Sequence, residues 1–286
     1  MTVAAAGPNA EQIRYWNQTL APRWVEQEAM LDAQIAPLGL AAMERARVLP
    51  GERVIDVGCG CGQTSLQLAE RVGPAGSVLG IDIATPMLER ARARASGRAN
   101  VRFAAADAQT HRFEPDHDLV FSRFGVMFFA DPAAAFANLA KALRPGGRLA
   151  FVCWQAIDRN PWLLVPLRAV AGIVALPPPP APGAPGPFSF ADPERVRGIL
   201  AAAGFSEVAL EQASGELAIG AGGDLERAVE FALQMGPVAA ALREAGAAGE
   251  AARGRAADAI RTALAPFATP TGVRAGYAAW IATGRR

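Results

Sequence analysis

Short apolar runs recur along the middle of the chain, and glycine, proline or polar residues separate them. Each run has the length of one strand and is rich in valine, isoleucine, leucine or phenylalanine. The pattern predicts strands at residues 53–57, 77–83, 101–106, 119–121 and 148–154. Strands without a polar face are typical of a parallel sheet that is covered on both sides.

Segments with helical periodicity lie between these runs. They predict helices at residues 64–72, 86–95 and 132–143. The last of them has apolar residues at i, i+3, i+4 and i+7 from Phe136, and Arg144-Pro-Gly-Gly147 ends it. Strands that alternate with helices indicate an α/β fold with a parallel sheet between helical layers.

The flanks follow another pattern. Residues 11–47 have a helical scatter of apolar and aromatic positions, and residues 224–268 are alanine-rich and helical in character. The stretch 177–190 is a proline-rich loop, while a helix that Asp192 caps and a strand at 205–210 follow it. A last strand is expected at 276–283. We therefore expect an N-terminal helical cap (1–48), a core domain (49–223), and a helical insertion with the final core strand (224–286).

Composition excludes several classes of protein. The chain has 28 Lys and Arg against 27 Asp and Glu, with no block of like charge, which disfavours a nucleic acid as partner. No apolar stretch reaches the roughly 20 residues of a membrane span. The first ten residues lack a basic segment followed by an apolar run, so we expect no signal peptide and a cytoplasmic protein.

The cysteines suggest neither disulfides nor a metal. The chain has 3 cysteines, and Cys59-x-Cys61 has no nearby cysteine or histidine that would complete a zinc site. We interpret Cys59 and Cys61 as small side chains in a crowded loop. No metal site is predicted.

The candidate chemistry begins with a glycine loop at the end of the first strand. In Asp56-Val-Gly58-Cys-Gly60-Cys-Gly62, glycine at every second position allows sharp turns and lets a ligand approach the main chain. The helix that follows directs its N-terminal N–H groups at whatever the loop holds. Ligands of open α/β sheets bind at this edge.

A nicotinamide dinucleotide is one alternative for this loop, because its fingerprint is G-x-G-x-x-G/A. Counting from Gly58 puts Gln63 where a small residue is needed, and counting from Gly60 puts Ser65 there. Asp56 also has no role in the dinucleotide pattern. The register therefore favours another ligand, although it leaves an NAD(P)-dependent oxidoreductase open.

Several segments in a fixed order carry a family resemblance. They are Asp56-x-Gly58-x-Gly60-x-Gly62, Gly80-Ile-Asp82-Ile83 with Pro86-Met87-Leu88, Ala106-Asp107-Ala108, Phe121-Ser122-Arg123-Phe124 with Asp131-Pro132, and Leu143-Arg-Pro-Gly-Gly147. Together they resemble class I S-adenosylmethionine-dependent methyltransferases, in the branch of the ubiquinone and menaquinone biosynthesis enzymes. The resemblance covers roughly residues 49–154. It implies a Rossmann-like, doubly wound sheet of about seven strands, with the last strand antiparallel and helical cap additions.

The resemblance also implies a cofactor, S-adenosyl-L-methionine, and residues that hold it. Asp82 would accept the ribose hydroxyls, and Asp107 with Ala108 would contact the adenine. Ile83 and Met87 would enclose the adenine ring, while Ser122 and Arg123 would offer main-chain contacts to the methionine part. The full set of expected cofactor residues is Tyr15, Trp16, Asp56, Gly58, Cys59, Gly60, Gly62, Asp82, Ile83, Met87, Asp107, Ala108, Ser122 and Arg123.

The side chain of Arg123 is expected to point away from the positively charged sulfur or to bind substrate. The alternative for Asp82 is a helix N-cap, and for Asp107 an ordinary loop aspartate. Ile83 and Met87 could equally be core residues.

An aromatic cluster predicts the acceptor side. Phe124, Met127 and Phe128 follow the fourth strand and Trp154 ends the fifth, so we expect them to bind a small apolar or aromatic acceptor. His111, His117 and Tyr15 are weak candidates for a general base, and no catalytic residue is assigned. The predicted function is methyl transfer to carbon, oxygen or nitrogen of a small molecule. A binding protein without catalysis also stays open, as does a homodimer.

Overall fold

The computed structural model describes residues 3–181 and 183–286, so residues 1–2 of the expected N-terminal cap and residue 182 of the proline-rich loop lie outside it. The strands are β1 (Arg53–Val57), β2 (Ser77–Asp82), β3 (Val101–Ala105), β4 (His117–Arg123), β5 (Leu143–Trp154), β6 (Ser206–Ala218), β7 (Ala268–Thr269) and β8 (Gly272–Arg285). The helices are α1 (Ala10–Tyr15), α2 (Ala21–Glu26), α3 (Glu28–Ala46), α4 (Gln63–Val72), α5 (Thr85–Arg94), α6 (Pro132–Ala142), α7 (Pro161–Val170), α8 (Pro193–Ala202), α9 (Leu225–Gln234), α10 (Gly236–Glu244) and α11 (Ala247–Leu264).

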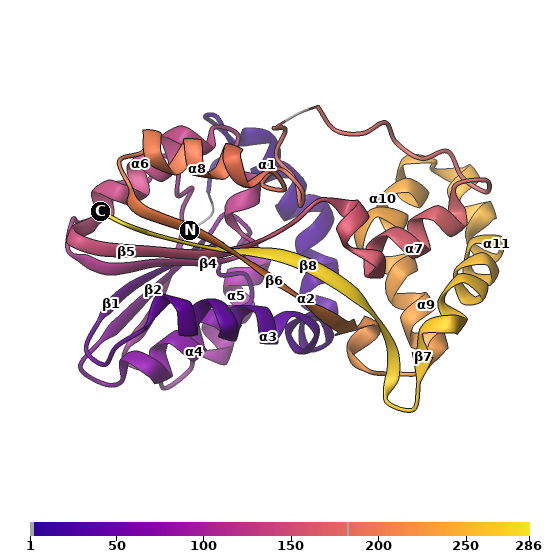
Figure 1. Ribbon diagram of the computed structural model, residues 1–286, viewed down its shortest axis with the longest axis horizontal. Coiled ribbons are helices and arrows are strands. Elements are labelled where there is room, and N and C mark those ends of the chain that lie inside the picture. The colour runs from indigo at the N-terminus through magenta and orange to yellow at the C-terminus, as the bar shows by residue number, and fades with distance from the viewer. Residues whose placement is uncertain (1–2, 182) are drawn as a thin grey trace.

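The strands form one twisted sheet in the order β3-β2-β1-β4-β5-β8-β6, and β7 forms a hairpin with β8. The strands from β3 to β5 in this order pair in parallel, whereas β8 runs antiparallel to both β5 and β6. Helices α3 and α4 cover one face of the sheet and α6 and α8 the other (Figure 1). The predicted doubly wound α/β fold, with an antiparallel last strand, is confirmed.

Local signals set most helix boundaries. Asp131 caps α6 by accepting a hydrogen bond from the Ala134 N–H, and Asp192 caps α8 through the Glu194 N–H, with proline at the first position of each helix. The last two strands in the order of the sheet, β8 and β6, are longer than the strands predicted for them at 276–283 and 205–210. Their alanine, glycine and polar positions give no apolar run, and cross-strand pairing extends them instead.

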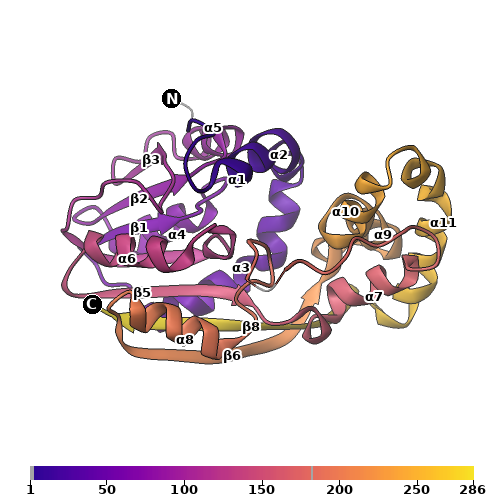
Figure 2. The same ribbon diagram turned by 90° about the horizontal axis from the view of Figure 1, so that it is seen from above.

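The N-terminal region is helical, as its pattern over 11–47 predicts, but the helix is interrupted. A π-helical turn (Trp16–Leu20) separates α1 from α2, and Gln27 ends α2 before α3 begins. Pro22 has no N–H to donate to the preceding turn, which accounts for the irregular helix there. We call residues 9–27 the N-terminal strap. The strap lies next to α5, although the two are far apart in the sequence (Figure 2).

Helices α7, α9, α10 and α11 gather into a helical lobe at one end of the sheet (Figure 2). The described parts of the proline-rich stretch contain neither helix nor strand, and its end is held to the core by the Met127 carbonyl. That carbonyl accepts hydrogen bonds from the Gly186 N–H (3.0 Å) and the Ser189 hydroxyl (2.7 Å). Among the described residues no helix combines the length and apolar character that crossing a bilayer requires.

The core between the sheet and α6 is aromatic. Phe136 of α6 is fully buried, and its ring lies 5.5 Å from that of Phe151 and 6.0 Å from that of Phe190, measured between centroids. Phe190 is the residue at which the proline-rich stretch enters the core. The same cluster therefore fixes α6, β5 and the end of that stretch.

A buried carboxylate fixes the start of α4. One oxygen of Asp56, at the end of β1, accepts hydrogen bonds from the hydroxyls of Thr64 and Ser65, both at 2.6 Å. The other oxygen is buried without a hydrogen-bond partner among the described residues. Burial raises the pKa of Asp56 from 3.8 to about 6, against the lowering effect of the two hydroxyls.

Replacement of Phe136 by alanine should lower the free energy of unfolding by about 3–5 kcal/mol, because it leaves a cavity among three buried rings. Urea denaturation followed by circular dichroism measures the change. Leu176→Ala, at a leucine that is 36% exposed, is the matched control and should cost less than about 1 kcal/mol. Equal losses in the two variants would contradict this assignment of the core.

Asp56 should make the protein less stable as the pH rises. The folded state binds the Asp56 proton more tightly than the unfolded state, so the free energy of unfolding falls between about pH 4 and pH 6 and is then level. The contribution is about 3 kcal/mol. Asp56→Asn removes it, and urea midpoints across this pH range should show the wild type losing stability relative to the variant. Asp158→Asn, at an exposed carboxylate, should follow the wild type; a profile of Asp56→Asn parallel to both would refute the assignment.

Candidate functional site

The loops that follow β1 and β4 meet at the carboxyl edge of the sheet. Gly58, Gly60 and Gly62 all have positive φ, at 65°, 55° and 85°. A Cβ on Gly58 would lie 2.7 Å from the Gly125 Cα, and one on Gly60 would lie 2.9 Å from the Met87 methyl group. The glycine loop is therefore pressed against the β4 loop on one side and α5 on the other, as only glycine permits.

Asp82 ends β2 beside this loop. Its Oδ2 accepts a hydrogen bond from the Gly60 N–H and its Oδ1 one from the Ala84 N–H, both at 2.8 Å. Burial raises the pKa of this carboxyl. The N-cap of α5 is Ala84, so Asp82 does not cap that helix. Asp82 is partly exposed, and each oxygen keeps lone pairs, so the carboxylate can accept two further hydroxyl donors.

Asp107 and Ala108 lie beyond the end of β3, and both are buried. The Asp107 Oδ1 accepts hydrogen bonds from the Asn9 side-chain amide (2.8 Å) and from the Gln109 N–H (2.9 Å). The Ala108 carbonyl accepts one from Asn138 of α6 (2.9 Å). Asp107 is therefore an ordered, buried carboxylate and not a freely moving loop residue.

The N-terminal strap covers the ends of β1 and β2. Met87 and Cys61 are buried together with Ala21, and Trp16 and Trp24 pack against them. The Asn17 side chain donates to the Ile83 carbonyl (2.8 Å) and accepts from the Thr85 N–H (2.9 Å). Ile83 and Met87 thus lie where the strap meets the glycine loop.

Tyr15 is placed differently from the expectation. Its side chain is 40% exposed, and its hydroxyl contacts Arg243 of α10 at 3.4 Å. On the π-helical path of this segment, Trp16 faces the site while Tyr15 faces the helical lobe. Trp16 thus packs against the cluster that contains Met87, whereas Tyr15 contacts the helical lobe.

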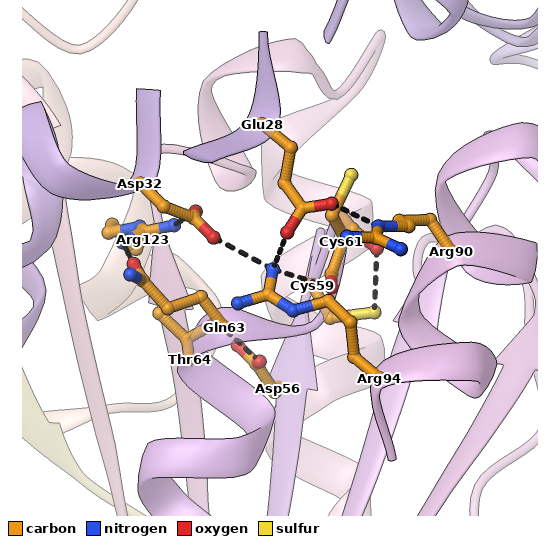
Figure 3. A network of polar contacts seen from close by, with 11 residues as sticks. Glu28, Asp32, Asp56, Cys59, Cys61, Gln63, Thr64, Arg90, Arg94 and Arg123 are labelled. Carbon is orange, nitrogen blue, oxygen red and sulfur yellow. Dashed lines mark hydrogen bonds and ion pairs between the residues drawn. The ribbon is translucent and has the colours of Figure 1, made fainter. Parts of the chain in front are cut away.

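Arg123 points away from the acceptor side, into a buried ionic network (Figure 3). Its guanidinium lies 3.1 Å from the Asp32 carboxylate and donates to the Gln63 side chain. Arg94 of α5 pairs with Asp32 (2.8 Å) and Glu28 (2.7 Å) and donates to the Cys61 carbonyl (3.1 Å). Burial lowers the pKa of Arg123, and Asp32 opposes that shift. Of the two expected orientations of this side chain, the structure has the one that points away, where Asp32 and Gln63 engage it.

Ser122 ties β1 to the β4 loop. Its hydroxyl donates to the Val57 carbonyl (2.7 Å) and accepts from the Gly125 N–H (3.2 Å). This buried side chain therefore joins the end of β1 to the β4 loop. The main chain of Ser122 lies near the carboxyl edge of the sheet, where the ligand is expected.

The predicted acceptor residues form an aromatic wall. The rings of Phe124 and Trp154 stack with centroids 4.1 Å apart and planes 13° apart, and Phe124 holds a φ of 61° that is unusual for a bulky residue. Phe128 meets Trp16 edge-on at 5.2 Å. Met127 is buried beneath them. Backbone strain at an ordered aromatic residue is typical of a functional site.

The two histidines differ in position. His117 is the first residue of β4, at the amino edge of the sheet, and its Nδ1 lies 3.3 Å from the Ala142 carbonyl. His111 packs edge-on against Phe113 at 4.7 Å, and its N–H donates to the Asp107 carbonyl (2.8 Å) in the loop after β3. The position of His117 does not suit a base at the carboxyl edge.

Two contacts with the strap were missed by sequence reasoning. Asn9 and Asn17 reach Asp107 and the start of α5 across separations of 98 and 66 residues. An asparagine before a helix, such as Asn9, usually indicates an N-cap, and Asn17 lies within the π-helical turn, so no local signal identifies these contacts. Within the described part of the chain, no group of histidine, cysteine and acidic side chains is arranged to hold a metal ion.

Known proteins share this domain. Residues 54–147 match the family described as "Methyltransferase domain". The chain is 41% identical over 118 residues to aklanonic acid methyltransferase DauC of Streptomyces sp. (strain C5), covering 40% of this chain and 54% of that protein. It is 36% identical over 170 residues to nocamycin O-methyltransferase of Saccharothrix syringae, covering 56% and 61%. The chain thus spans less than two thirds of each relative's length.

Solved structures share the fold. The phosphoethanolamine N-methyltransferase 2 of Haemonchus contortus, in complex with phosphomonomethylethanolamine and S-adenosylhomocysteine, superposes with a TM-score of 0.60 at 18% identity, covering 98% of this chain and 60% of that one. The YcgJ protein of Bacillus subtilis superposes with a TM-score of 0.55 at 18% identity, covering 87% and 97%. The glycine loop, Asp82 and Asp107 all lie within or beside strands of the matched domain. Residues 54–147 therefore form a methyltransferase domain, and the chain shares its fold with S-adenosylmethionine-dependent methyltransferases.

Proposed function

We propose that this chain binds S-adenosyl-L-methionine and transfers its methyl group to carbon, oxygen or nitrogen of a small, apolar or aromatic acceptor. The observation that carries the proposal is Asp82. It is held by two backbone N–H groups, partly exposed, and directly beside a glycine loop that admits no side chain. A nucleoside with two ribose hydroxyls matches such a carboxylate.

The residues present fit the cofactor. Asp82 would hold the ribose, Asp107 and Ala108 the adenine, and the glycine loop with the N-terminus of α4 the methionine part. Asp56, whose Oδ1 is buried without a hydrogen-bond partner among the described residues, would place a carboxylate beneath the methionine part. Bound there, the cofactor supplies a methyl group on a positively charged sulfur.

The chain's own contribution is alignment and exclusion of water. Transfer requires the acceptor atom to lie in line with the methyl group, and the stacked Phe124 and Trp154 rings offer a rigid flat wall for a planar molecule. Trp16 and Phe128 shield the site from the strap side. No residue is assigned as general base, and an acceptor that keeps its proton until after transfer needs none.

The balance of 28 basic and 27 acidic residues supports a small-molecule acceptor and not a nucleic acid. A cytoplasmic location is part of the proposal. It is supported by three cysteines that are all buried and free.

The donor site is tested by calorimetric titration with S-adenosylhomocysteine. The wild type should bind it, and NADH should not compete. Asp82→Ala should weaken binding by roughly a hundredfold, because two hydrogen bonds to a carboxylate are lost. Asp118→Ala, at the amino end of β4 and so at the opposite edge of the sheet, is the control and should bind as the wild type does. Unchanged affinity in a folded Asp82→Ala protein, or competition by NADH, would refute the site.

The acceptor wall is tested by transfer of a tritiated methyl group into an extract of the native host. Label should enter a product that partitions into organic solvent. Trp154→Leu should reduce that product at least about fivefold while the affinity for S-adenosylhomocysteine stays within about twofold. Trp280→Leu, whose indole donates to the Ala191 carbonyl elsewhere, is the matched control. Label that stays in water-soluble polymers, or equal effects of both substitutions, would contradict the aromatic acceptor.

A further inference from the structure

Asn9 occupies the N-cap position of α1 but does not cap it, because its side chain makes no hydrogen bond to that helix. The residue is 3% exposed, although it lies close to the chain terminus. Its side chain instead bridges the β3 and β4 loops. The usual reason for an asparagine before a helix therefore does not apply here.

The orientation of the Asn9 amide is fixed by its partners. The Ala130 N–H can only meet an acceptor, and it lies 2.7 Å from the Asn9 Oδ1. The Nδ2 consequently donates, to the Asp107 Oδ1 at 2.8 Å and to the Gln109 Oε1 at 3.2 Å. Gln109 is tied to the same β4 loop, since its Oε1 also accepts from the Asp131 N–H (3.2 Å).

These hydrogen bonds are accepted by one carboxylate oxygen of Asp107 and leave the other oxygen free to accept. Oδ1 accepts from Asn9 and from the Gln109 N–H, whereas no donor within residues 3–181 and 183–286 bonds to Oδ2. Two N–H groups on one oxygen hold the plane of the carboxylate. The side chain is thereby presented with a defined, unused acceptor.

Asn17 provides a contrast within the same strap. Its side chain bonds only to backbone groups, the carbonyls of Ile13 and Ile83 and the Thr85 N–H. It anchors the strap without touching a titratable side chain. Loss of Asn17 loosens the cover, whereas loss of Asn9 also frees Asp107 to turn.

We propose that Asn9 is a positioning residue that sets the preference for adenine by orienting Asp107. This inference rests on the proposed function, in which Asp107 accepts from the adenine amino group. An Oδ2 that is fixed in place stabilises a ligand with a hydrogen-bond donor opposite it. A ligand with a carbonyl oxygen there binds more weakly, because two acceptors then face each other. Selectivity for the base thus depends on docking of the strap.

The test compares two ligands that differ only at the base. S-inosylhomocysteine has a carbonyl oxygen and an N1 proton where S-adenosylhomocysteine has the amino group and a bare nitrogen. Calorimetry should show that the wild type prefers the adenosyl compound by about ten- to a hundredfold. In Asn9→Ala this ratio should fall at least about fivefold, beyond any loss of affinity shared by both ligands.

Two further variants distinguish the orientation of Asp107 from the covering of the site by the strap. Asn9→Asp keeps the acceptor for the Ala130 N–H but lacks the donor to Asp107, so its ratio should fall as it does in Asn9→Ala. Asn17→Ala should weaken both ligands by the same factor and keep the wild-type ratio. Melting curves check that each variant is folded.

A ratio that is unchanged in Asn9→Ala and Asn9→Asp would overturn the role of Asn9. An equal fall in Asn17→Ala would also overturn it, since covering alone would then explain selectivity. If the wild type binds neither ligand, the proposed function fails together with this inference. Binding of the adenosyl compound with an unchanged ratio defeats the inference alone.

Discussion

The contact between Gly58 and Gly125 is the constraint on which the rest of the site depends. It brings the loops after β1 and β4 together at a distance that no side chain tolerates, and the Ser122 hydroxyl bridges the same junction. Because Gly125 must reach Gly58, the chain turns at once after β4, and Phe124 takes its positive φ. That turn puts the Phe124 ring on Trp154. One close approach thus sets both the donor loop and the aromatic wall.

The buried ionic network explains why an arginine is tolerated one residue from the acceptor wall. A free guanidinium beside a positively charged sulfur would oppose binding, but Asp32 and Gln63 engage Arg123 on the far side of β4. The arrangement is costly to disturb, since withdrawal of α3 would leave Arg123 buried without a counter-charge. The network therefore specifies where α3 docks more than it adds to stability. In turn, α3 fixes the end of the strap.

Sequence reasoning predicted what local chemistry encodes. Apolar runs placed β1 to β5, proline and glycine ended α6, and spacing brought Asp82 to the glycine loop. What it left open or missed depends on partners far away in the chain. The direction of Arg123 follows from Asp32, 91 residues earlier, and the role of Asn9 from Asp107, 98 residues later. The edge strand β6 extends beyond its predicted part at 205–210, because its pairing with β8 continues to Ala218.

The strap connects the two halves of the site. Its Asn9 and Asn17 hold the side where the donor's adenine and ribose would lie, while its Trp16 packs against Phe128 on the acceptor side. Neither half can be uncovered alone, because a few turns of helix carry all three contacts. Tyr15 extends the same segment toward α10 of the helical lobe. A segment that the sequence shows only as a helical cap therefore joins the sheet, the lobe and both proposed binding surfaces, so that its docking would exclude water from both in the same step.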